Sequence, residues 1–319
     1  MAAIIETKNL VKRYGRITAV DNVTLTVDEG GIYGFVGPNG GGKTSTMRIL
    51  TTLLQPTSGH AWVAGHSVTE DPRGVRRAIG YMPDFFGVYD DMKVWEYLDF
   101  FAACYNVPES QRLGLINDLL ELVDLSHRKD DFVDTLSRGM KQRLCLARTL
   151  AHDPQVLILD EPASGLDPRA RIEIRELLVE LSRLGKTIFF STHILADVAE
   201  ICTEIGIIEA GRLVATGQPE EMQRRLMPQR RLALTVLGSA EQAREALQQN
   251  EMVVNVEAGK AGDGAATRAT LQVDFTGDDE AVAGLLSELV RIGLPVLHLS
   301  EDTRDLEEVF MRATKGIVS

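Results

Sequence analysis

The first 220 residues alternate short apolar runs with longer amphipathic stretches, a pattern typical of strands that alternate with helices. Strands are expected at residues 4–14, 23–27 and 32–37, followed by an apolar helical pattern over residues 43–54. Residues 156–160, 186–192 and 204–209 are rich in β-branched side chains and show no apolar–polar alternation. Because such runs suit strands buried on both faces, we expect an α/β core with helices on either side of a sheet.

A stretch from about residue 85 to 150 has helical rather than strand-like periodicity. Apolar residues recur at the spacing of one helix face between Leu113 and Val123. A second helix is expected from about Gly139 to Ala151. We therefore expect a helical subdomain inserted into the α/β core.

After residue 220 the order of elements changes. Strands are expected at residues 231–237, 252–257, 270–275 and 296–300, with helices at 239–249, 278–292 and 303–314. The resulting β-α-β-β-α-β order is that of a small α+β, ferredoxin-like domain, with one helix added. We expect two domains, residues 1–220 and 221–319, as the length of 319 residues also favours.

Charge and composition exclude several classes of protein. There are 34 Lys and Arg against 46 Asp and Glu, a net charge of −12, so no nucleic-acid partner bound through a basic face is expected. The three cysteines are scattered, which favours a reducing compartment and neither a disulfide framework nor a zinc site. No apolar stretch is long enough to span a membrane, and the first residues lack the apolar core of a signal peptide. These features predict a cytoplasmic protein.

The strongest chemical signal is GPNGGGKT at residues 37–44, which matches the phosphate-loop pattern G-x-x-x-x-G-K-[ST] between an expected strand and an expected helix. Its glycines let backbone N–H groups turn toward phosphate oxygens. Lys43 can place its charge on the β- and γ-phosphates, and Thr44 offers a hydroxyl ligand for Mg²⁺. The alternative interpretation is a glycine-rich turn. The expected nucleotide contacts here are Gly37, Pro38, Asn39, Gly40, Gly41, Gly42, Lys43, Thr44 and Ser45.

The segment VLILDEP at residues 156–162 supplies an acid pair at the end of an apolar strand. Ligands of α/β proteins bind at the carboxyl ends of such strands. Asp160 can hold Mg²⁺ through a water, and Glu161 can orient or deprotonate an attacking water. Without a phosphate loop, the same two acids would indicate a turn and a helix cap.

Together these segments resemble the nucleotide-binding subunits of ABC transporters. LSRGMKQRL (136–144, here the signature segment) resembles the family's LSGGQQQRL, ASGLD (163–167) resembles its D-loop, and STHIL (191–195) resembles its switch-histidine segment. Tyr14 matches the aromatic that stacks on adenine. The resemblance covers residues 4–220 and implies a P-loop ABC-ATPase fold that binds ATP and Mg²⁺ and hydrolyses ATP.

The resemblance also implies roles for single residues. Ser137 and Gly139 would face the γ-phosphate of ATP bound to the other subunit. His193 would hydrogen-bond the γ-phosphate beside Glu161 and Lys43, which completes the expected catalytic set. A plainer interpretation stands beside each: a helix N-cap for Ser137, an edge histidine for His193 and a strand-edge ring for Tyr14.

Two segments depart from the family pattern. Asp84 stands where the family's Q-loop carries Gln, and we hypothesise that it still ligates Mg²⁺ together with Thr44 and Asp160. Alternatively, Asp84 caps a turn after Pro83. In the signature segment Arg138 replaces Gly and Met140 replaces Gln. Because the phosphate-facing residues are retained, competence for hydrolysis is expected.

Aromatic residues are concentrated between Phe85 and Tyr105, where eight of the 18 in the chain fall. In the family this region receives the transmembrane subunit, so we expect Phe85, Phe86 and Tyr89 to line that groove. The resemblance thus implies a transmembrane permease as partner and a location at the inner face of the cell membrane.

Several functional questions stay open at this point. The second ATPase of the dimer could be an identical chain or a related one. The C-terminal DLEEVFMRAT resembles ATPases of drug, antibiotic, polysaccharide or lipid exporters, and the substrate cannot be read from this chain. The alternatives are a soluble ABC-type ATPase that acts on ribosomes or nucleic acid, and a module that holds ATP without turnover.

Overall fold

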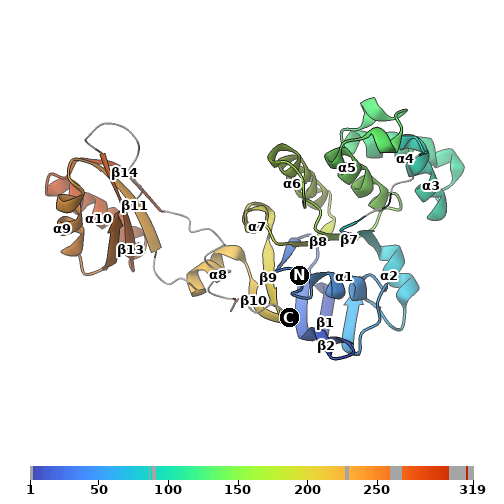
Figure 1. The fold of residues 1–319 in the computed structure, drawn as a ribbon, viewed down its shortest axis with the longest axis horizontal. Coiled ribbons are helices and arrows are strands. Elements are labelled where there is room, and N and C mark those ends of the chain that lie inside the picture. The colour runs from blue at the N-terminus through green and yellow to red at the C-terminus, as the bar shows by residue number, and fades with distance from the viewer. Residues whose placement is uncertain are drawn as a thin grey trace. The chain divides into compact units, whose positions relative to one another are not determined.

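A computed structural model describes residues 3–85, 87, 91–226, 230–258, 268–301 and 314. The chain forms two compact units, one that includes the residues up to Pro219 and one that begins at Glu220 (Figure 1). No helix of the described residues combines the length and the hydropathy needed to cross a bilayer.

The larger sheet of the first unit has the strand order β10–β9–β3–β8–β7–β6. Strands β9 to β6 run parallel, and β10 pairs antiparallel at one edge. As the runs without alternation predicted, β7 and β8 are buried along their whole length, and β9 is buried at all but its first residue. Strand β3 is also buried along its whole length. The strands are β3 (Ile32–Val36), β6 (Ile79–Met82), β7 (Val156–Asp160), β8 (Thr187–Thr192), β9 (Glu204–Glu209) and β10 (Arg212–Gly217).

A smaller antiparallel sheet, in the order β2–β1–β4–β5, packs with helix α1 (Lys43–Leu50) in one apolar core. Its strands are β1 (Ala3–Tyr14), β2 (Ile17–Asp28), β4 (Ser58–Val63) and β5 (His66–Ser67). Met47, Ile49 and Leu50 of α1 are fully buried in this core. The helix that follows the phosphate loop is therefore anchored in this core.

The remaining helices of the first unit extend beyond this core. Helix α2 (Pro72–Ala78) precedes β6, and α3 (Val94–Cys104), α4 (Glu109–Leu122) and α5 (Arg138–Thr149) contact one another in the region where a helical subdomain was expected. Short 3₁₀ turns at Ser126–Arg128 and Val133–Thr135 connect α4 to α5. Helices α6 (Pro168–Arg183) and α7 (Leu195–Ile201) both contact β8.

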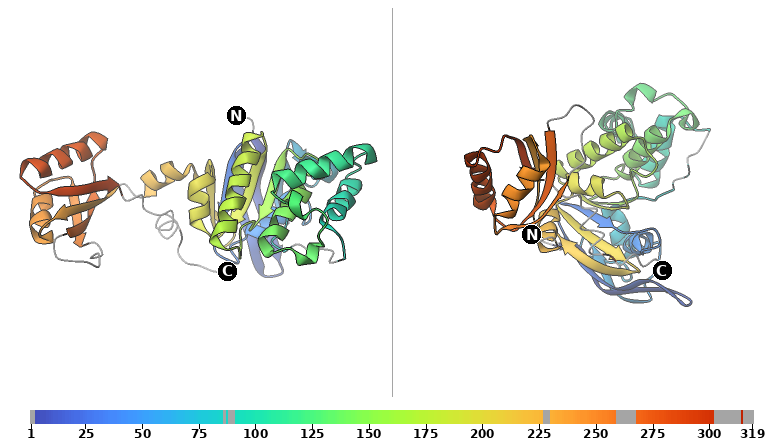
Figure 2. Two further views of the ribbon diagram at one scale, coloured as in Figure 1. Left: turned by 90° about the horizontal axis from the view of Figure 1, so that it is seen from above. Right: turned by 60° about the vertical axis from the view of Figure 1, so that its left-hand side comes forward.

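The second unit is an antiparallel sheet in the order β12–β13–β11–β14 with two helices (Figure 2). This is the strand order of the predicted split βαβ arrangement. Helix α8 (Pro219–Leu226) precedes β11 (Arg230–Leu237), α9 (Ala240–Gln248), β12 (Val253–Ala258), β13 (Arg268–Phe275), α10 (Asp279–Arg291) and β14 (Val296–Glu301). Alternate residues of β11 and β13 form a separate core with both helices. The helix expected at 303–314 lies outside the described residues, except for Thr314.

Candidate active site

The functional side chains come from the carboxyl ends of neighbouring parallel strands. In the sheet β3 lies beside β8, β8 beside β7, and β7 beside β6. Lys43 follows β3, His193 follows β8, Asp160 ends β7 and Asp84 follows β6. The topology thus gathers at one sheet edge residues that are far apart in the sequence, as ligand sites of α/β folds do.

Two glycines allow the phosphate loop to approach other backbone closely. A Cβ at Gly37 would lie 2.3 Å from the Ile208 carbonyl oxygen. Gly42 has φ +105°, and a Cβ there would lie 2.4 Å from the Ala19 carbonyl oxygen. Gly42 is also the N-cap of α1 and has no side chain to cap it, so the first N–H groups of the helix suit an anion.

The Lys43 ammonium is buried at the mouth of the loop. Its Nζ donates to the Gly37 carbonyl at 2.8 Å and to the Pro38 carbonyl at 3.2 Å, and lies 3.4 Å from Glu161 Oε1. The charge is thus held in place by two carbonyls and one carboxylate. A phosphate group at the loop would replace such contacts with stronger ones to its own oxygens.

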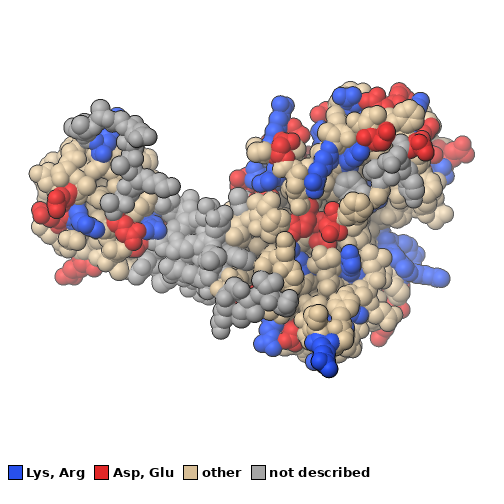
Figure 3. All heavy atoms as spheres, viewed as in Figure 1, with Lys and Arg blue, Asp and Glu red and all other residues tan. Residues whose placement is uncertain are grey.

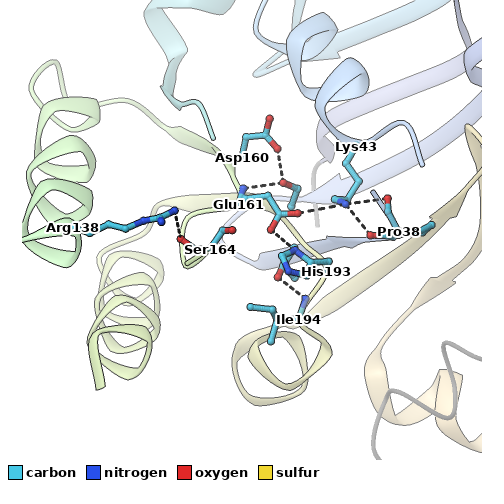
Figure 4. Close-up of polar contacts among 11 residues, drawn as sticks. Pro38, Lys43, Arg138, Asp160, Glu161, Ser164, His193 and Ile194 are labelled. Atoms are coloured by element: carbon cyan, nitrogen blue, oxygen red, sulfur yellow. Dashed lines mark hydrogen bonds and ion pairs between the residues drawn. The ribbon is translucent and has the colours of Figure 1, made fainter. Parts of the chain in front are cut away.

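Glu161 connects this lysine to the switch histidine (Figure 4). Its Oε2 lies 2.7 Å from His193 Nδ1, and its backbone N–H donates to Ser191 Oγ at 2.9 Å. The residue has φ +53°, in the left-handed region that is strained for residues other than glycine. Strained backbone conformations cluster at functional sites. Here the strained residue places its carboxylate between Lys43 and His193.

Asp160 is a buried acid with one oxygen left over. Ser191 Oγ donates to its Oδ1 at 2.6 Å, whereas Oδ2 has no hydrogen-bond partner of normal geometry among the described residues. Burial raises the pKa of Asp160, hydrogen bonding from Ser191 and Thr44 lowers it, and the nearby Asp84 and Glu161 charges raise it. A cation at Oδ2 would satisfy this oxygen, so the residues fit a metal ion.

The described residues contain no group of three or more His, Cys, Asp or Glu side chains able to hold a metal ion. An ion beside Asp160 would therefore need hydroxyl oxygens such as that of Thr44, and oxygens of a ligand. That requirement fits Mg²⁺, which commonly takes one or two carboxylates and completes its shell with phosphates and waters.

A hollow of about 540 Å³ lies over these groups. Most of the predicted phosphate-loop residues line it, together with Asp84, Glu161 and His193. Asp84 lines the hollow, and its carboxylate accepts a hydrogen bond from the Phe85 N–H of its own turn. The lining residues are Ile17, Ala19, Pro38, Asn39, Gly40, Gly42, Lys43, Thr44, Ser45, Asp84, Glu161, Ser164 and His193.

Tyr14 is not one of the residues that line this hollow. Its ring is 46% exposed, and Lys12 Nζ lies 5.3 Å from the ring centroid. Ile17, its partner across the β1–β2 hairpin, lines the hollow instead. The ring therefore stands beside the described pocket rather than in it.

Ser137 and Gly139 lie at a different place. Ser137 is the N-cap of α5 and accepts a hydrogen bond from the Met140 N–H at 3.3 Å. Both residues line a second hollow of about 230 Å³ with Gly165 and Asp167. Within one chain, the signature segment and the phosphate loop thus border separate hollows.

Four residues at the site were not predicted from the sequence: Ser191, Ser164, Ile17 and Ala19. Ser191 had a usable signal, because it lies near the end of a buried strand, two residues before His193. The contribution of Ile17 and Ala19 depends on how β2 approaches the phosphate loop, which no local pattern encodes.

A phosphate loop, an acid pair and a histidine at adjacent strand ends define a nucleotide-binding protein of the P-loop class. The sequence pattern of the ABC transporter family matches residues 20–164. The chain is 39% identical over 222 residues to the Nod factor export ATP-binding protein I of Cupriavidus metallidurans, covering 70% of this chain and 73% of that one. It is 28% identical over 313 residues to the linearmycin resistance ATP-binding protein LnrL of Bacillus subtilis, covering 98% of each chain.

Solved structures agree with this. An ATP-binding subunit of an ABC transporter matches with a TM-score of 0.63 at 30% identity, covering 70% of this chain and 92% of that one. The structure of cbiO1 from Clostridium perfringens, part of the ABC transporter complex cbiONQ, matches with a TM-score of 0.63 at 28% identity over 69% of this chain and 90% of that one. The chain belongs to the ABC transporter family, as an ATP-binding subunit.

Proposed function

We propose that the chain binds Mg²⁺–ATP at the phosphate loop and hydrolyses it. The observation that carries the proposal is the position of the Glu161 carboxylate, 3.4 Å from Lys43 and 2.7 Å from His193 at the strand ends. Lys43 binds the terminal phosphates, Glu161 orients or deprotonates the attacking water, and His193 holds the γ-phosphate side of the site. Tyr14 is proposed to stack on the adenine from beside the pocket.

Thr44 and Asp160 would hold the Mg²⁺ ion, with Asp84 as a further oxygen ligand. When bound, the ion neutralises charge on the phosphate oxygens. The unpartnered Asp160 Oδ2 supports this assignment, as does the place of Thr44 and Asp84 in the lining of the hollow over the phosphate loop.

Two ATPase subunits are proposed to complete each other's sites. Support comes from the separate hollows of one chain, because Ser137 and Gly139 do not border the phosphate-loop hollow of their own chain. Their hollow would receive the γ-phosphate of ATP bound to an identical chain or to a related second ATPase.

The hydrolysis is proposed to power transport through a separate transmembrane permease, with this chain at the inner face of the cell membrane. Export is the proposed direction, on the names of the relatives. The relatives carry names of Nod factor export and linearmycin resistance. Phe85 is 83% exposed directly after Asp84, which suits a surface that a permease covers. Phe86 and Tyr89, predicted to share that groove, lie outside the described residues.

An ABC-type ATPase that acts on ribosomes or nucleic acid is the second candidate. The net charge of −12 opposes a sequence-independent phosphate-backbone interaction. On the face shown in Figure 3, basic and acidic side chains are interspersed over the first unit. The membrane-linked function is therefore preferred.

The direct experiment is phosphate release by the purified chain with ATP, with and without Mg²⁺. We expect Mg²⁺-dependent hydrolysis that Glu161→Gln abolishes, since an amide cannot accept the proton of water. Glu180→Gln, at an exposed glutamate of α6, is the matched control and should keep the rate of the unsubstituted chain. Equal rates for Glu161→Gln and the unsubstituted chain would refute the assigned role.

A further inference from the structure

The arginine that departs from the family's signature pattern makes a contact that a glycine cannot make. Arg138 is the first residue of α5, and its Nη2 donates to the Ser164 carbonyl at 3.1 Å. Figure 4 shows the side chain reaching from α5 to the segment that follows Glu161. Hydrogen bonds from a charged donor are among the stronger ones in proteins.

The residue after Ser164 is a glycine, and the arginine side chain lies against it. Gly165 has φ +68°, and a Cβ there would lie 2.5 Å from both Cζ and Nη2 of Arg138. The guanidinium group thus occupies the space that any other side chain at position 165 would need. Gly165 suits the positive φ at this position and, separately, leaves room for the guanidinium group where it now lies.

A second side chain of α5 donates a hydrogen bond to the same segment. Gln142, one helical turn after Arg138 and on the same helix face, donates from Nε2 to the Pro162 carbonyl at 2.5 Å. Gln142 is buried, whereas Arg138 is exposed. Two carbonyls within three residues of Glu161 are therefore held by one face of the signature helix.

The contact also lies between the two hollows. Ser164 lines the hollow over the phosphate loop, and Arg138 lines the hollow of the signature segment. A single side chain therefore links the place where the chain's own nucleotide is proposed to lie with the surface proposed to meet the nucleotide of a second subunit.

We propose that Arg138 is a positioning residue that fixes the backbone of residues 162–165 to the signature helix and so holds Glu161 in its aimed conformation. The expected effect of Arg138 on the hydrolysis rate rests on the proposed function. The expected effect on the backbone does not, because it can be measured on the chain without nucleotide. Since Arg138 does not contact the phosphate loop in the described contacts, its loss should lower turnover and leave ATP affinity unchanged.

The backbone effect is tested by hydrogen exchange of the full chain without nucleotide. Arg138→Met keeps the length of the side chain and removes the guanidinium. We expect faster exchange of amides in residues 162–167, where the Ser164 N–H donates to the Glu161 carbonyl at 3.1 Å. Arg183→Met, at an exposed arginine of α6, should leave that segment unchanged. Unchanged exchange in Arg138→Met would overturn the proposal whether or not the chain hydrolyses ATP.

The effect on rate is tested by steady-state hydrolysis of Mg²⁺–ATP. Arg138→Met should lower kcat by about five- to tenfold, as loss of one charged-donor hydrogen bond predicts, with KM for ATP unchanged. Arg138→Lys should recover part of the rate, because it keeps one charged donor. A raised KM with unchanged kcat would contradict positioning and indicate direct contact with a nucleotide.

A double-mutant cycle with Gly165→Ala separates this contact from general damage. In the unsubstituted background Gly165→Ala introduces both backbone strain and a clash with Arg138, whereas in Arg138→Gly only the strain remains. The fold-loss in kcat caused by Gly165→Ala should therefore be smaller in the Arg138→Gly background. Equal fold-losses in the two backgrounds would overturn the proposal. If the unsubstituted chain shows no hydrolysis, the proposed function fails, and the exchange experiment alone decides the role of Arg138.

Discussion

At the residue scale, Asp160 carries the clearest electrostatic signature of the site. Its carboxylate is buried, one oxygen is held by Ser191, and the other has no partner of normal geometry among the described residues. Burial of such a charge destabilises the protein unless a cation or donor compensates it. The side chain is therefore placed to bind a ligand, and this placement lowers the stability of the chain without the ligand.

Asp160→Asn should raise the melting temperature of the nucleotide-free chain at neutral pH and remove its stabilisation by Mg²⁺–ATP. The physical reason is that the amide removes the desolvated charge together with the metal ligand. Thermal denaturation with and without Mg²⁺–ATP checks both parts. A lower melting temperature for the free variant, with Mg²⁺–ATP stabilisation retained, would refute the assignment.

The same pair of proteins gives a pH dependence. Because burial raises the pKa of Asp160, the folded chain binds this proton more tightly than the unfolded chain does. The destabilisation caused by the ionised group is therefore present at neutral pH and relieved as pH falls through the raised folded pKa. The stability difference between Asp160→Asn and the unsubstituted chain should shrink on acidification, as denaturant midpoints across pH would show. A difference that grows on acidification would contradict the sign of the shift.

Asp84 provides the third residue-scale prediction. Asp84→Ala should weaken the Mg²⁺ dependence of hydrolysis and lower the rate, because one oxygen ligand is lost from the hollow. A Mg²⁺ titration of the ATPase rate is the measurement. An unchanged titration and rate would leave Asp84 as a turn residue that accepts the Phe85 N–H.

At the scale of elements, the sequence was most informative where hydrophobic pattern and burial coincide. The runs at 156–160 and 186–192 became the fully buried β7 and β8, which present Asp160 and Ser191 at their ends. Helix α1 was expected over 43–54 but ends at Leu50, because Thr52 takes φ +63°. The hollow over the phosphate loop was only partly predictable, since Ile17 and Ala19 reach it through pairing of β1 with β2.

The segment between β6 and α3 carries a prediction about assembly. Phe85→Ala should weaken co-purification with the membrane subunit, because an exposed aromatic is removed from the proposed interface. The basal ATPase rate should be retained, since the ring is 83% exposed. Leu184→Ala, at a 61% exposed leucine after α6, is the control for loss of a surface apolar group. Loss of the basal rate in Phe85→Ala would instead indicate a structural role.

At the scale of the whole molecule, the two compact units have separate apolar cores. Leu234→Ala, at a fully buried position of the second core, should destabilise that unit by about 2–5 kcal/mol. Calorimetry should show this loss in one transition, while Mg²⁺–ATP shifts the other. A single transition that both Leu234→Ala and Mg²⁺–ATP shift would show that the units unfold together.

The β-α-β-β-α-β order of the second unit was predictable because β11 and β13 alternate between buried and less buried residues and because α9 and α10 each bury apolar residues. Its function was not, since no expected catalytic, nucleotide-binding or metal-binding residue lies beyond His193. The exporter-like names of relatives, one of which matches over 98% of this chain, make an accessory role in an exporter the proposal for this unit.

The central claim is that two such ATPase subunits close on ATP and that Glu161 then activates the water that hydrolyses it. The most direct test is the molar mass of Glu161→Gln in solution by light scattering, with and without ATP. The account predicts a monomer without ATP and a stable dimer with it, because binding proceeds while hydrolysis is blocked. A Glu161→Gln chain that binds ATP and stays monomeric would contradict the claim.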